Sequence, residues 1–339
     1  MKVHEAAKML GVTPRTLRFY EEKGLITPYK ALENRYRDYS EADLIQLRWI
    51  ISLRELGLPL SSIQDALSAV QQPDAFLRKV EAARKLLYES WITATKALQA
   101  LDETISVWEK NGNTNLHQLE SAAEEMKQNR MLRASWSDLW NYDDIALQHG
   151  YRAPLITLNG IISEEHYNLS LHKTIEWLDP RHDEIGLELG AGSGNLSVLV
   201  TNAGAKLTVV EQSAEMLSLI RERLPDVDAK QGNLLALPLA AQSYSFIVCT
   251  FAMHHLTSSQ QLLALAEMDR VLLNGGRIVI TGLMNPIEEE LETGNYVEQQ
   301  LKWCPSSAFE LANWLNVKGY STLSNPLGTP IGLLYACKP

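Results

Sequence analysis

A short glycine-rich stretch in the middle of the chain has residue types and spacing that suit the binding of a nucleotide. It reads ELGAGSG at residues 188–194 and begins within an apolar run at 185–189. Glycines leave no side chain between the backbone and a ligand, so a strand, a glycine turn and a helix in this order let an adenosyl group lie on the loop. One such motif is weakly diagnostic by itself, and its meaning depends on the residues that follow.

Further landmarks follow at the ends of later apolar runs. Glu211 closes the next run, roughly 20 residues after the glycines, where a carboxylate can accept hydrogen bonds from both hydroxyls of a ribose. Met216 comes soon after and could cover an adenine, and Asn233 follows the third expected strand. The order of these residues therefore extends the nucleotide-binding interpretation beyond the glycines.

Two adjacent histidines, His254 and His255, follow the apolar run at 246–250. A histidine there could act as a catalytic base, which helps a transfer reaction only if the acceptor must lose a proton. Adjacent side chains point in different directions, so we expect at most one of the two to face a cavity. The alternative is a loop histidine held by hydrogen bonds, without a chemical role.

A second set of chemical groups lies near the N-terminus, in the sequence TPRTLRFY at residues 13–20. A helix that enters the major groove of DNA needs small or polar residues at its start and basic residues along its exposed side. Arg15, Thr16 and Arg18 meet this requirement. Tyr20 lies on the same helix, but an aromatic residue at this position can equally belong to the core.

A basic and aromatic segment, NRYRDYS at residues 34–40, could grip phosphates beside that helix. Phosphate oxygens can accept hydrogen bonds from the guanidinium groups of Arg35 and Arg37 and from the hydroxyls of Tyr36 and Tyr39. A merely solvated basic face is the alternative interpretation.

Helices separated by turns are expected to hold these N-terminal residues. The sequence predicts a short helix at 3–9 and a second helix that is capped by Thr13, begins at Pro14 and ends by Gly24. Pro14 suits the first helical position because its missing N–H costs nothing there.

The next segment changes from extended to helical. Residues 25–39 favour an extended hairpin because they contain aromatic residues and proline. Ser40 with Asp43 forms a capping box for a third helix. Pro59 starts a fourth helix, which ends near Val70.

A long helical stretch follows, in which apolar residues are spaced by three and four. This spacing is a heptad seam, which needs a partner helix. A helix over residues 75–110 is about 50 Å long at 1.5 Å per residue. The partner comes from a second copy or from the same chain, and we expect a homodimer because two-fold pairs are the commonest oligomers. The seam residues are Phe76, Val80, Ala83, Leu87, Trp91, Ala94, Leu98, Leu101, Ile105 and Trp108.

Residues 114–180 are mostly helical in pattern, and the pattern changes after about residue 185. Short apolar runs at 185–189, 207–210, 246–250 and 277–281 then alternate with helical stretches. This alternation is typical of a parallel sheet with crossover helices. The predicted fold class is therefore multidomain: an all-α winged helix-turn-helix, a long dimerisation helix, and an α/β doubly wound Rossmann-like domain.

Charge is distributed unevenly along the chain. The net charge is −10, but residues 1–54 hold ten Lys or Arg and seven Asp or Glu, a local charge of +3 that leaves −13 for the remainder. A small basic end on an acidic body suits a protein that touches DNA with one domain.

Cysteine usage and hydropathy exclude several classes of protein. Cys249, Cys304 and Cys337 form no C-x-x-C pair, so we expect neither a disulfide framework nor a metal site. No apolar run reaches the roughly 18 residues that a membrane span needs. We therefore expect a cytoplasmic protein that makes no membrane contact.

Residues 3–70 resemble the DNA-binding domain of MerR-type transcription regulators. The resemblance rests on TLRFYEEKGLI, NRYRDYS and LRELGLPLSSI, in this order. Members of this family commonly have glycine where this chain has Arg35. The resemblance implies a dimer joined by a long antiparallel helix, on promoter DNA that is bent and untwisted. The resemblance implies that the residues in contact with double-stranded DNA are Arg15, Thr16, Arg18, Tyr20, Arg35, Arg37 and Tyr39.

Residues 132–339 resemble class I S-adenosylmethionine (SAM)-dependent methyltransferases, particularly those that act on small molecules. The resemblance rests on the glycine motif, Glu211, GNL at 232–234, HHL at 254–256 and GGRIVI at 275–280. This order favours SAM over NAD as the cofactor. The residues that it implies around SAM are Glu188, Gly190, Ala191, Gly192, Glu211, Gln212, Met216, Asn233, Leu234 and Thr250.

The resemblance also implies individual roles. Glu211 would hold the ribose, Met216 the adenine, and Asn233 the adenine amino group, although Asn233 and Glu188 both stand where the family more often has Asp. Tyr142 would belong to an N-terminal lid that touches SAM or substrate. The fourth strand ends in TFAM at 250–253 rather than in the Asp/Asn-Pro-Pro-aromatic motif of nucleobase methylases, so a small-molecule acceptor is expected.

Together these patterns predict a bifunctional protein, a dimeric transcription regulator that also methylates a small molecule. The predicted domains are 1–72 for DNA binding, 73–112 for the dimerisation helix, and 113–339 for the methyltransferase with its lid. The alternative keeps the fold but makes the last domain a non-catalytic sensor of SAM or another ligand.

Overall fold

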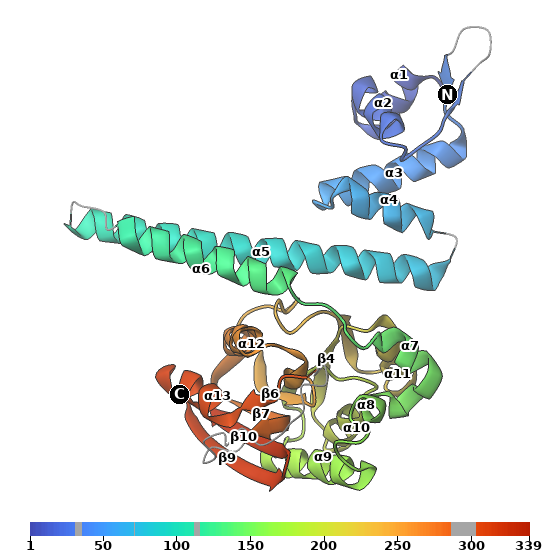
Figure 1. Ribbon diagram of the computed structural model, residues 1–339. Coiled ribbons are helices and arrows are strands. Elements are labelled where there is room, and N and C mark those ends of the chain that lie inside the picture. The colour runs from blue at the N-terminus through green and yellow to red at the C-terminus, as the bar shows by residue number, and fades with distance from the viewer. Residues whose placement is uncertain (31–35, 71, 112–115, 286–302) are drawn as a thin grey trace. The chain divides into compact units, whose positions relative to one another are not determined.

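The computed structural model describes residues 1–30, 36–70, 72–111, 116–285 and 303–339 (Figure 1). The chain divides into two compact units, Met1–Leu87 and Tyr88–Pro339, and the long helix α5 belongs partly to each. The predicted fold class is confirmed, because a helical N-terminal region with a long helix precedes an α/β domain with Rossmann-like strand order.

The first unit contains short helices and a two-stranded hairpin. As predicted, the Thr13 hydroxyl oxygen caps α2 by accepting the N–H of Thr16 at 3.1 Å, and Ser40 with Asp43 forms the capping box of α3. The described part of the predicted hairpin contains two antiparallel strands of two residues each. The elements are α1 (Val3–Leu10), α2 (Pro14–Glu22), β1 (Tyr29–Lys30), β2 (Arg37–Asp38), α3 (Glu41–Glu55) and α4 (Leu60–Ser68).

These helices pack around one core because the apolar residues of each recur on one face. Leu17 of α2, Leu47 and Ile50 of α3, and Ile63 of α4 are fully buried in it. Ala83 of α5 belongs to the same core, so the first part of the long helix is integral to this unit.

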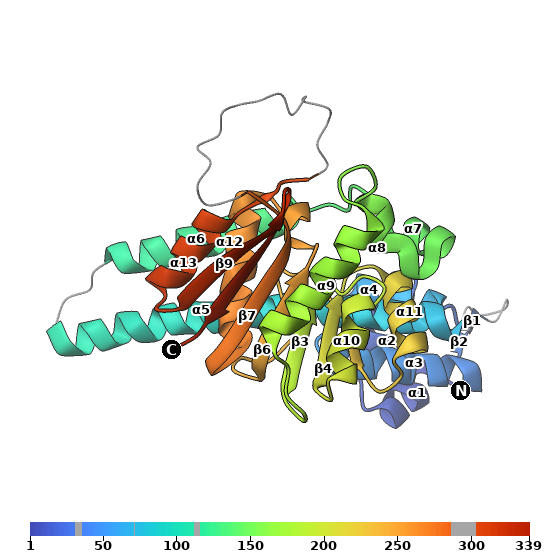
Figure 2. The same ribbon diagram turned by 90° about the horizontal axis from the view of Figure 1, so that it is seen from below.

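Helix α5 is a single 39-residue helix (Pro73–Asn111), in agreement with the long helix predicted from the sequence. Helix α6 (Leu116–Ala134) runs back in the opposite direction, so the two form a hairpin (Figures 1 and 2). Within the second unit, five seam residues of α5 have side chains that are 44–61% exposed. These five, here called the apolar stripe, are Trp91, Leu98, Leu101, Ile105 and Trp108.

A mixed sheet forms the centre of the second unit. Its order is β5-β4-β3-β6-β7-β10-β9, and β8 pairs with the end of β7. The strands from β5 to β7 are parallel as predicted, whereas β10 pairs antiparallel with both β7 and β9. The strands are β3 (Ile185–Leu189), β4 (Lys206–Glu211), β5 (Asp228–Gln231), β6 (Tyr244–Thr250), β7 (Leu272–Asn285), β8 (Ser306–Ser307), β9 (Ser321–Gly328) and β10 (Ile331–Cys337).

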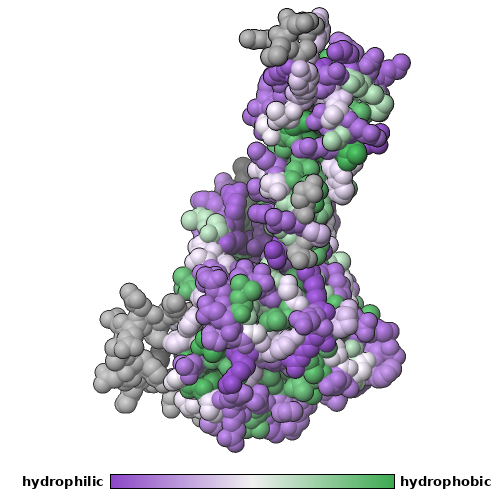
Figure 3. Space-filling model, turned by 90° about the vertical axis from the view of Figure 1, so that its right-hand side faces the viewer, coloured by the Kyte–Doolittle hydropathy of each residue, from purple (hydrophilic) through white to green (hydrophobic). Residues whose placement is uncertain are grey.

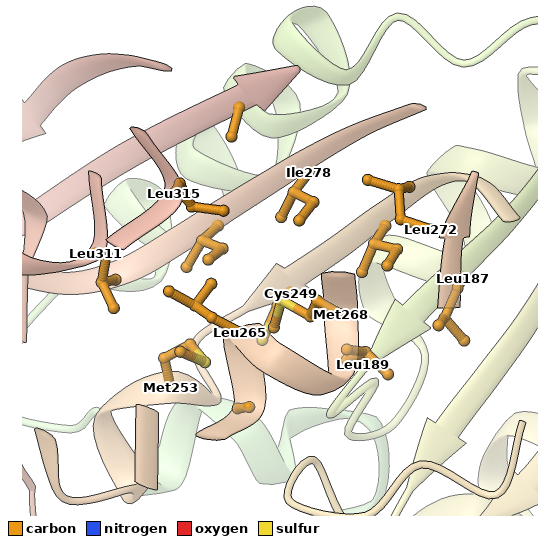
Figure 4. Packing of buried hydrophobic residues seen from close by; sticks show 14 of the residues in the cluster. Leu187, Leu189, Cys249, Met253, Leu265, Met268, Leu272, Ile278, Leu311 and Leu315 are labelled. Carbon is orange, nitrogen blue, oxygen red and sulfur yellow. The ribbon is translucent and has the colours of Figure 1, made fainter. Parts of the chain in front are cut away.

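Helices cover both faces of this sheet, and each face has its own core (Figure 2). Leu189 and Cys249 face α12 and α13, in the packing that Figure 4 shows, whereas Val209 and Val248 face α9, α10 and α11. The helices of this unit, besides those of the hairpin, are α7 (Tyr142–His149), α8 (Ala153–Thr157), α9 (Glu164–Leu178), α10 (Asn195–Asn202), α11 (Ala214–Arg223), α12 (Ser258–Val271) and α13 (Ala308–Val317), with short 3-10 turns η1 (Gly150–Arg152) and η2 (Met253–His255).

The three cysteines are free thiols, and Cys249 is buried in the sheet. Among the residues that the structure describes, no helix is long and apolar enough to cross a membrane, and no group of three or more His, Cys, Asp or Glu could hold a metal ion. Hydrophilic and hydrophobic residues are interspersed on the face drawn in Figure 3.

Candidate functional site

A pocket opens at the carboxyl ends of the parallel strands β3, β4, β5 and β6. The empty space between its lining residues is about 1060 Å³, a figure that includes open solvent at the mouth. Ligands of open α/β sheets bind at this edge, where loops diverge from the strand ends. Nine of the ten residues that were predicted to surround SAM line this pocket: Gly190, Ala191, Gly192, Glu211, Gln212, Met216, Asn233, Leu234 and Thr250.

Two positions of the glycine loop require a residue without a side chain. Gly190 has a φ of +63°, and a Cβ there would lie 2.4 Å from the Cβ of Ala252. Gly192 has a φ of +56°, and its Cβ would lie 3.1 Å from Pro154. Left-handed backbone and close neighbours therefore both require glycine, which brings the loop's backbone to the pocket surface.

Glu211 is the carboxylate at the centre of the pocket wall. Its Oε2 accepts the N–H of Gly192 at 2.8 Å, and its Oε1 accepts the N–H groups of Gln212 and Ser213 at 2.7 and 2.8 Å. Burial raises the pKa of Glu211, and the three backbone hydrogen bonds act in the opposite direction. Because a carboxylate has about four acceptor positions, Glu211 retains capacity for a ligand hydroxyl.

The neighbouring amides form a small network. Asn233 donates from Nδ2 to Oε1 of Gln212 at 2.6 Å, and its Oδ1 accepts the N–H of Leu235 at 2.8 Å. An amide oxygen has two lone pairs, so one remains for a ligand donor. Met216, which is 2% exposed, closes the wall beside them.

Glu188 is the exception among the residues predicted around SAM, because it does not line the pocket. It lies behind the glycine loop, only 1% exposed, and its Oε2 accepts the hydroxyl of Ser197 on α10 at 2.6 Å. Its Oε1 has no hydrogen-bond partner among the described residues. Burial raises the pKa of Glu188 to about 8, so the side chain is suited to carrying a proton at neutral pH.

The two histidines differ in position, as expected for adjacent residues. His255 lines the pocket, and its Nε2 lies 2.6 Å from the hydroxyl of Tyr142, which also lines the pocket. Burial lowers the pKa of His255 to about 4. His254 is 1% exposed and does not line the pocket, and neither of its ring nitrogens has a hydrogen-bond partner in the described part of the chain. Its burial places it away from any ligand in this pocket.

Sequence reasoning missed two acidic residues near the lid. Asp138 accepts the N–H groups of Trp140, Asn141 and Tyr142, all at 2.9 Å, and so shapes the start of α7. Asp143 accepts the hydroxyl of Ser213 at 2.6 Å, which ties α7 to the start of α11. Both carboxylates line the pocket. The available signal was an acidic residue at a helix start, which is common in proteins and does not indicate a ligand site.

The predicted DNA-binding residues fall into two groups in the first unit. Arg15 and Arg18 of α2 are exposed, and Thr16 is half-buried beside them. Tyr20 and Tyr39 instead lie in the core, 6% and 2% exposed, because their rings fill the space between the helices and the hairpin. Tyr39 is therefore not exposed as a DNA contact would require, and for Tyr20 the structure favours the core alternative.

The other two predicted DNA contacts, Arg35 and Arg37, belong to the basic segment at residues 34–40. Arg37 is half-buried, and its guanidinium donates to Glu21 of α2, which also pairs with Lys30 at 2.6 Å. This contact fixes the hairpin to the predicted recognition helix. Arg35 lies outside the described residues.

Comparison with sequence families identifies both parts of the chain. Residues 1–70 match the MerR HTH family of regulatory proteins, and residues 187–276 match a methyltransferase domain family. The chain therefore carries a MerR-type helix-turn-helix domain followed by a class I SAM-dependent methyltransferase domain.

Individual relatives are similar to the methyltransferase part. An uncharacterized methyltransferase of Alkaliphilus oremlandii is 30% identical over 136 residues, 40% of this chain and 62% of that protein. A demethylmenaquinone methyltransferase of Renibacterium salmoninarum is 29% identical over 147 residues, 41% of this chain and 61% of that protein. The chain thus spans about three-fifths of the length of these two relatives. A SAM-dependent methyltransferase structure from Aquifex aeolicus is 19% identical, with a TM-score of 0.42, over 55% of this chain and 98% of that one.

Proposed function

We propose that this protein is a bifunctional regulator that binds promoter DNA with its first domain and methylates a small molecule with its last. The observation that carries the proposal is the meeting of Gly190, Glu211 and Asn233, from three different strand ends, in one pocket. The domains that we propose are 1–72, 73–112 and 113–339. A regulator of promoters acts where the chromosome is, in the cytoplasm.

SAM fits this pocket with its ribose on Glu211 and its adenine against Met216 and Asn233. The free acceptor capacity of Glu211 takes a ribose hydroxyl, and the second lone pair of the Asn233 amide oxygen takes the adenine amino group. Glu188, buried behind the loop, supports α10 and the loop rather than touching SAM. Methyl transfer is an in-line displacement at a sulfonium, so correct positioning supplies most of the rate.

The acceptor end of the pocket is formed by Tyr142 and His255. Of the two histidines His254 and His255, only His255 lines the pocket, so we assign it contact with the acceptor rather than the role of a base. With a pKa of about 4 it is neutral at physiological pH, and its Nε2 shares a hydrogen bond with the Tyr142 hydroxyl. The pair orients an acceptor, and a proton released on methylation passes to water.

DNA binding is assigned to the exposed face of α2. Arg15, Thr16 and Arg18 read and grip the duplex, while Arg37 holds the hairpin against α2. The protein acts as a homodimer through residues 75–110, because the apolar stripe on α5 is exposed in a single chain and a second copy would cover it. Two DNA-binding domains then meet the two halves of one promoter site.

A non-catalytic sensor is the second candidate, because Nε2 of His255 is already hydrogen-bonded to Tyr142 and His254 is buried outside the pocket, which leaves neither histidine well placed to take a proton from an acceptor. Incubation of the full-length protein with methyl-labelled SAM and a fractionated metabolite extract separates the two functions. Transfer of label to one low-molecular-weight fraction supports the enzyme. Saturable SAM binding without transfer to any fraction supports the sensor.

A further inference from the structure

The loop that follows β5, residues 233–239, connects the pocket to the α5–α6 hairpin. Asn233 and Leu234 line the pocket, and the next residue, Leu235, turns its carbonyl toward α6. Nε of Arg133, in the last turn of α6, donates to that carbonyl at 2.9 Å. A residue of the hairpin therefore holds the backbone one position away from the pocket wall.

The same loop is held from α12 as well. The guanidinium of Arg270 donates to the carbonyls of Leu237 and Leu239 at 3.1 and 2.8 Å, and Glu267 accepts the N–H of Leu237 at 3.0 Å. Arg270 also lies over the ring of Trp91, 5.9 Å from its centroid. Because Trp91 belongs to α5, both helices of the hairpin are linked to the loop.

The end of α6 is fixed at the pocket edge by further contacts. Nε2 of Gln260 donates to the carbonyl of Leu132 at 3.0 Å and lies 3.2 Å from the hydroxyl of Ser135. Trp136, just beyond the helix, lines the pocket. Nη2 of Arg133 is buried without a hydrogen-bond partner in the described chain. The guanidinium therefore has one further donor that a backbone carbonyl of the loop could accept.

We infer that Arg133 is a positioning residue that couples occupancy of the cofactor pocket to the α5–α6 hairpin. The inference rests on the proposed function, in which adenine binds against Asn233. A ligand that fixes Asn233 also fixes the carbonyl of Leu235, and the charge-assisted hydrogen bond of Arg133 passes that restraint to α6. Coupling between sites is reciprocal, so the state of the hairpin changes cofactor affinity by the same factor.

The consequence is that α5, which is linked to the pocket loop through Arg270 and Trp91, also belongs to the unit that carries the predicted DNA-binding residues. Helix α5 carries the apolar stripe in the second unit and continues into the core of the first unit at Ala83. Pairing of α5 in a dimer would thus alter the affinity of the pocket, and cofactor would alter the ordering of α5.

Hydrogen–deuterium exchange on the full-length protein tests the inference, with saturating S-adenosylhomocysteine as the ligand. We expect the ligand to slow exchange at pocket peptides 186–194 and 208–217 and, through Arg133, at hairpin peptides 88–111 and 116–134. The expected slowing in the hairpin is about fivefold or more, the low end of typical coupling between sites. Arg133→Ala is expected to abolish the ligand effect at peptide 116–134 of α6 and to keep it at the pocket peptides, while part of the effect at peptide 88–111 remains through the contact of Arg270 with Trp91.

Two further variants distinguish coupling from simple support of the fold. Arg130→Ala removes an exposed arginine one turn earlier on α6 and is expected to behave as the wild type. Arg133→Lys keeps one donor for the Leu235 carbonyl and is expected to retain part of the hairpin effect, which gives a readout if the alanine variant does not fold.

Each outcome decides a different question. Protected pocket peptides with an unchanged hairpin in the wild type, or an effect at peptide 116–134 that survives in Arg133→Ala, would overturn the coupling and leave the proposed function standing. Pocket peptides that do not respond in the folded wild type would instead overturn the proposed function, and the inference with it.

Discussion

The hydroxyl of Tyr142 lies 2.6 Å from Nε2 of His255, although 113 residues separate them in the chain. Burial raises the pKa of the Tyr142 phenol and lowers the pKa of His255 to about 4, so at neutral pH both groups are uncharged and share one hydrogen bond. Helix α7 is thereby bonded to the turn that follows β6, and both residues line the pocket.

This hydrogen bond should contribute measurably to stability. Tyr142→Phe leaves the buried Nε2 of His255 without its partner, which is expected to lower the free energy of unfolding of the second unit by about 1 kcal/mol. Urea unfolding followed by circular dichroism measures the change. Tyr151→Phe is the control, since its hydroxyl makes only a 3.5 Å contact near the surface. Equal stability of the two variants would contradict the assignment.

Glu188 predicts a particular dependence of stability on pH. Its pKa is about 8 in the fold and about 4.5 when unfolded, so the native state binds the extra proton between these values. Stability therefore falls as pH rises from about 4.5 to 8, and the loss is complete above pH 8. Glu188→Gln should remove this fall and be more stable than the wild type at pH 8, by about 1 kcal/mol or more.

Thermal unfolding from pH 5 to pH 8.5 measures the effect. The exposed Glu165→Gln is the matched control and should follow the wild-type curve. A Glu188→Gln variant whose stability declines with pH as steeply as the wild type would show that Glu188 is ionised in the fold.

The pocket's central residues could be placed from the sequence because each lies at or just beyond the end of its own strand. The carboxyl ends of parallel strands lie at one edge of a sheet. Recognition of the strands therefore predicts that Gly190, Glu211 and Asn233 lie close together. The partners of Tyr142 and Asp143 could not be placed in this way. Local sequence carries no signal for contacts that span 113 and 70 residues.

Burial was the other quantity that the sequence could not supply. Tyr20 and Tyr39 stand among basic residues and have hydroxyls suited to phosphate, yet their rings complete the core of the first unit. Glu188 belongs to a motif that is associated with the cofactor, yet its side chain points behind the loop to Ser197. Residue type alone does not distinguish an exposed donor from a buried one.

The apolar stripe predicts the oligomeric state. Leu98→Glu places a charge on the most exposed residue of the stripe and is expected to convert the dimer to a monomer, because a buried unpaired carboxylate is costly. Analytical ultracentrifugation gives the mass. Gln99→Glu adds the same charge on the neighbouring, exposed position and should remain dimeric. A wild-type protein that is monomeric at micromolar concentration refutes the dimer.

DNA contact by α2 predicts a salt-dependent loss of affinity. Arg15→Ala and Arg18→Ala should each weaken binding and reduce the slope of log affinity against log salt by about 1, as expected when one phosphate contact is removed. Fluorescence anisotropy with duplexes selected from a randomised pool measures both quantities. Arg130→Ala on α6 should leave them unchanged, and an unchanged slope in both α2 variants would remove this helix from the DNA interface.

Isothermal titration of SAM into the full-length protein tests the central claim most directly. The account predicts saturable binding to one site per chain, weakened at least about tenfold in Glu211→Gln, since hydrogen bonds to a charged group contribute about 1.5–3 kcal/mol. Glu222→Gln, an exposed carboxyl on α11, should bind as the wild type does. Absence of binding heat with folded wild-type protein, or equal affinity in folded Glu211→Gln, would contradict a SAM site in this pocket.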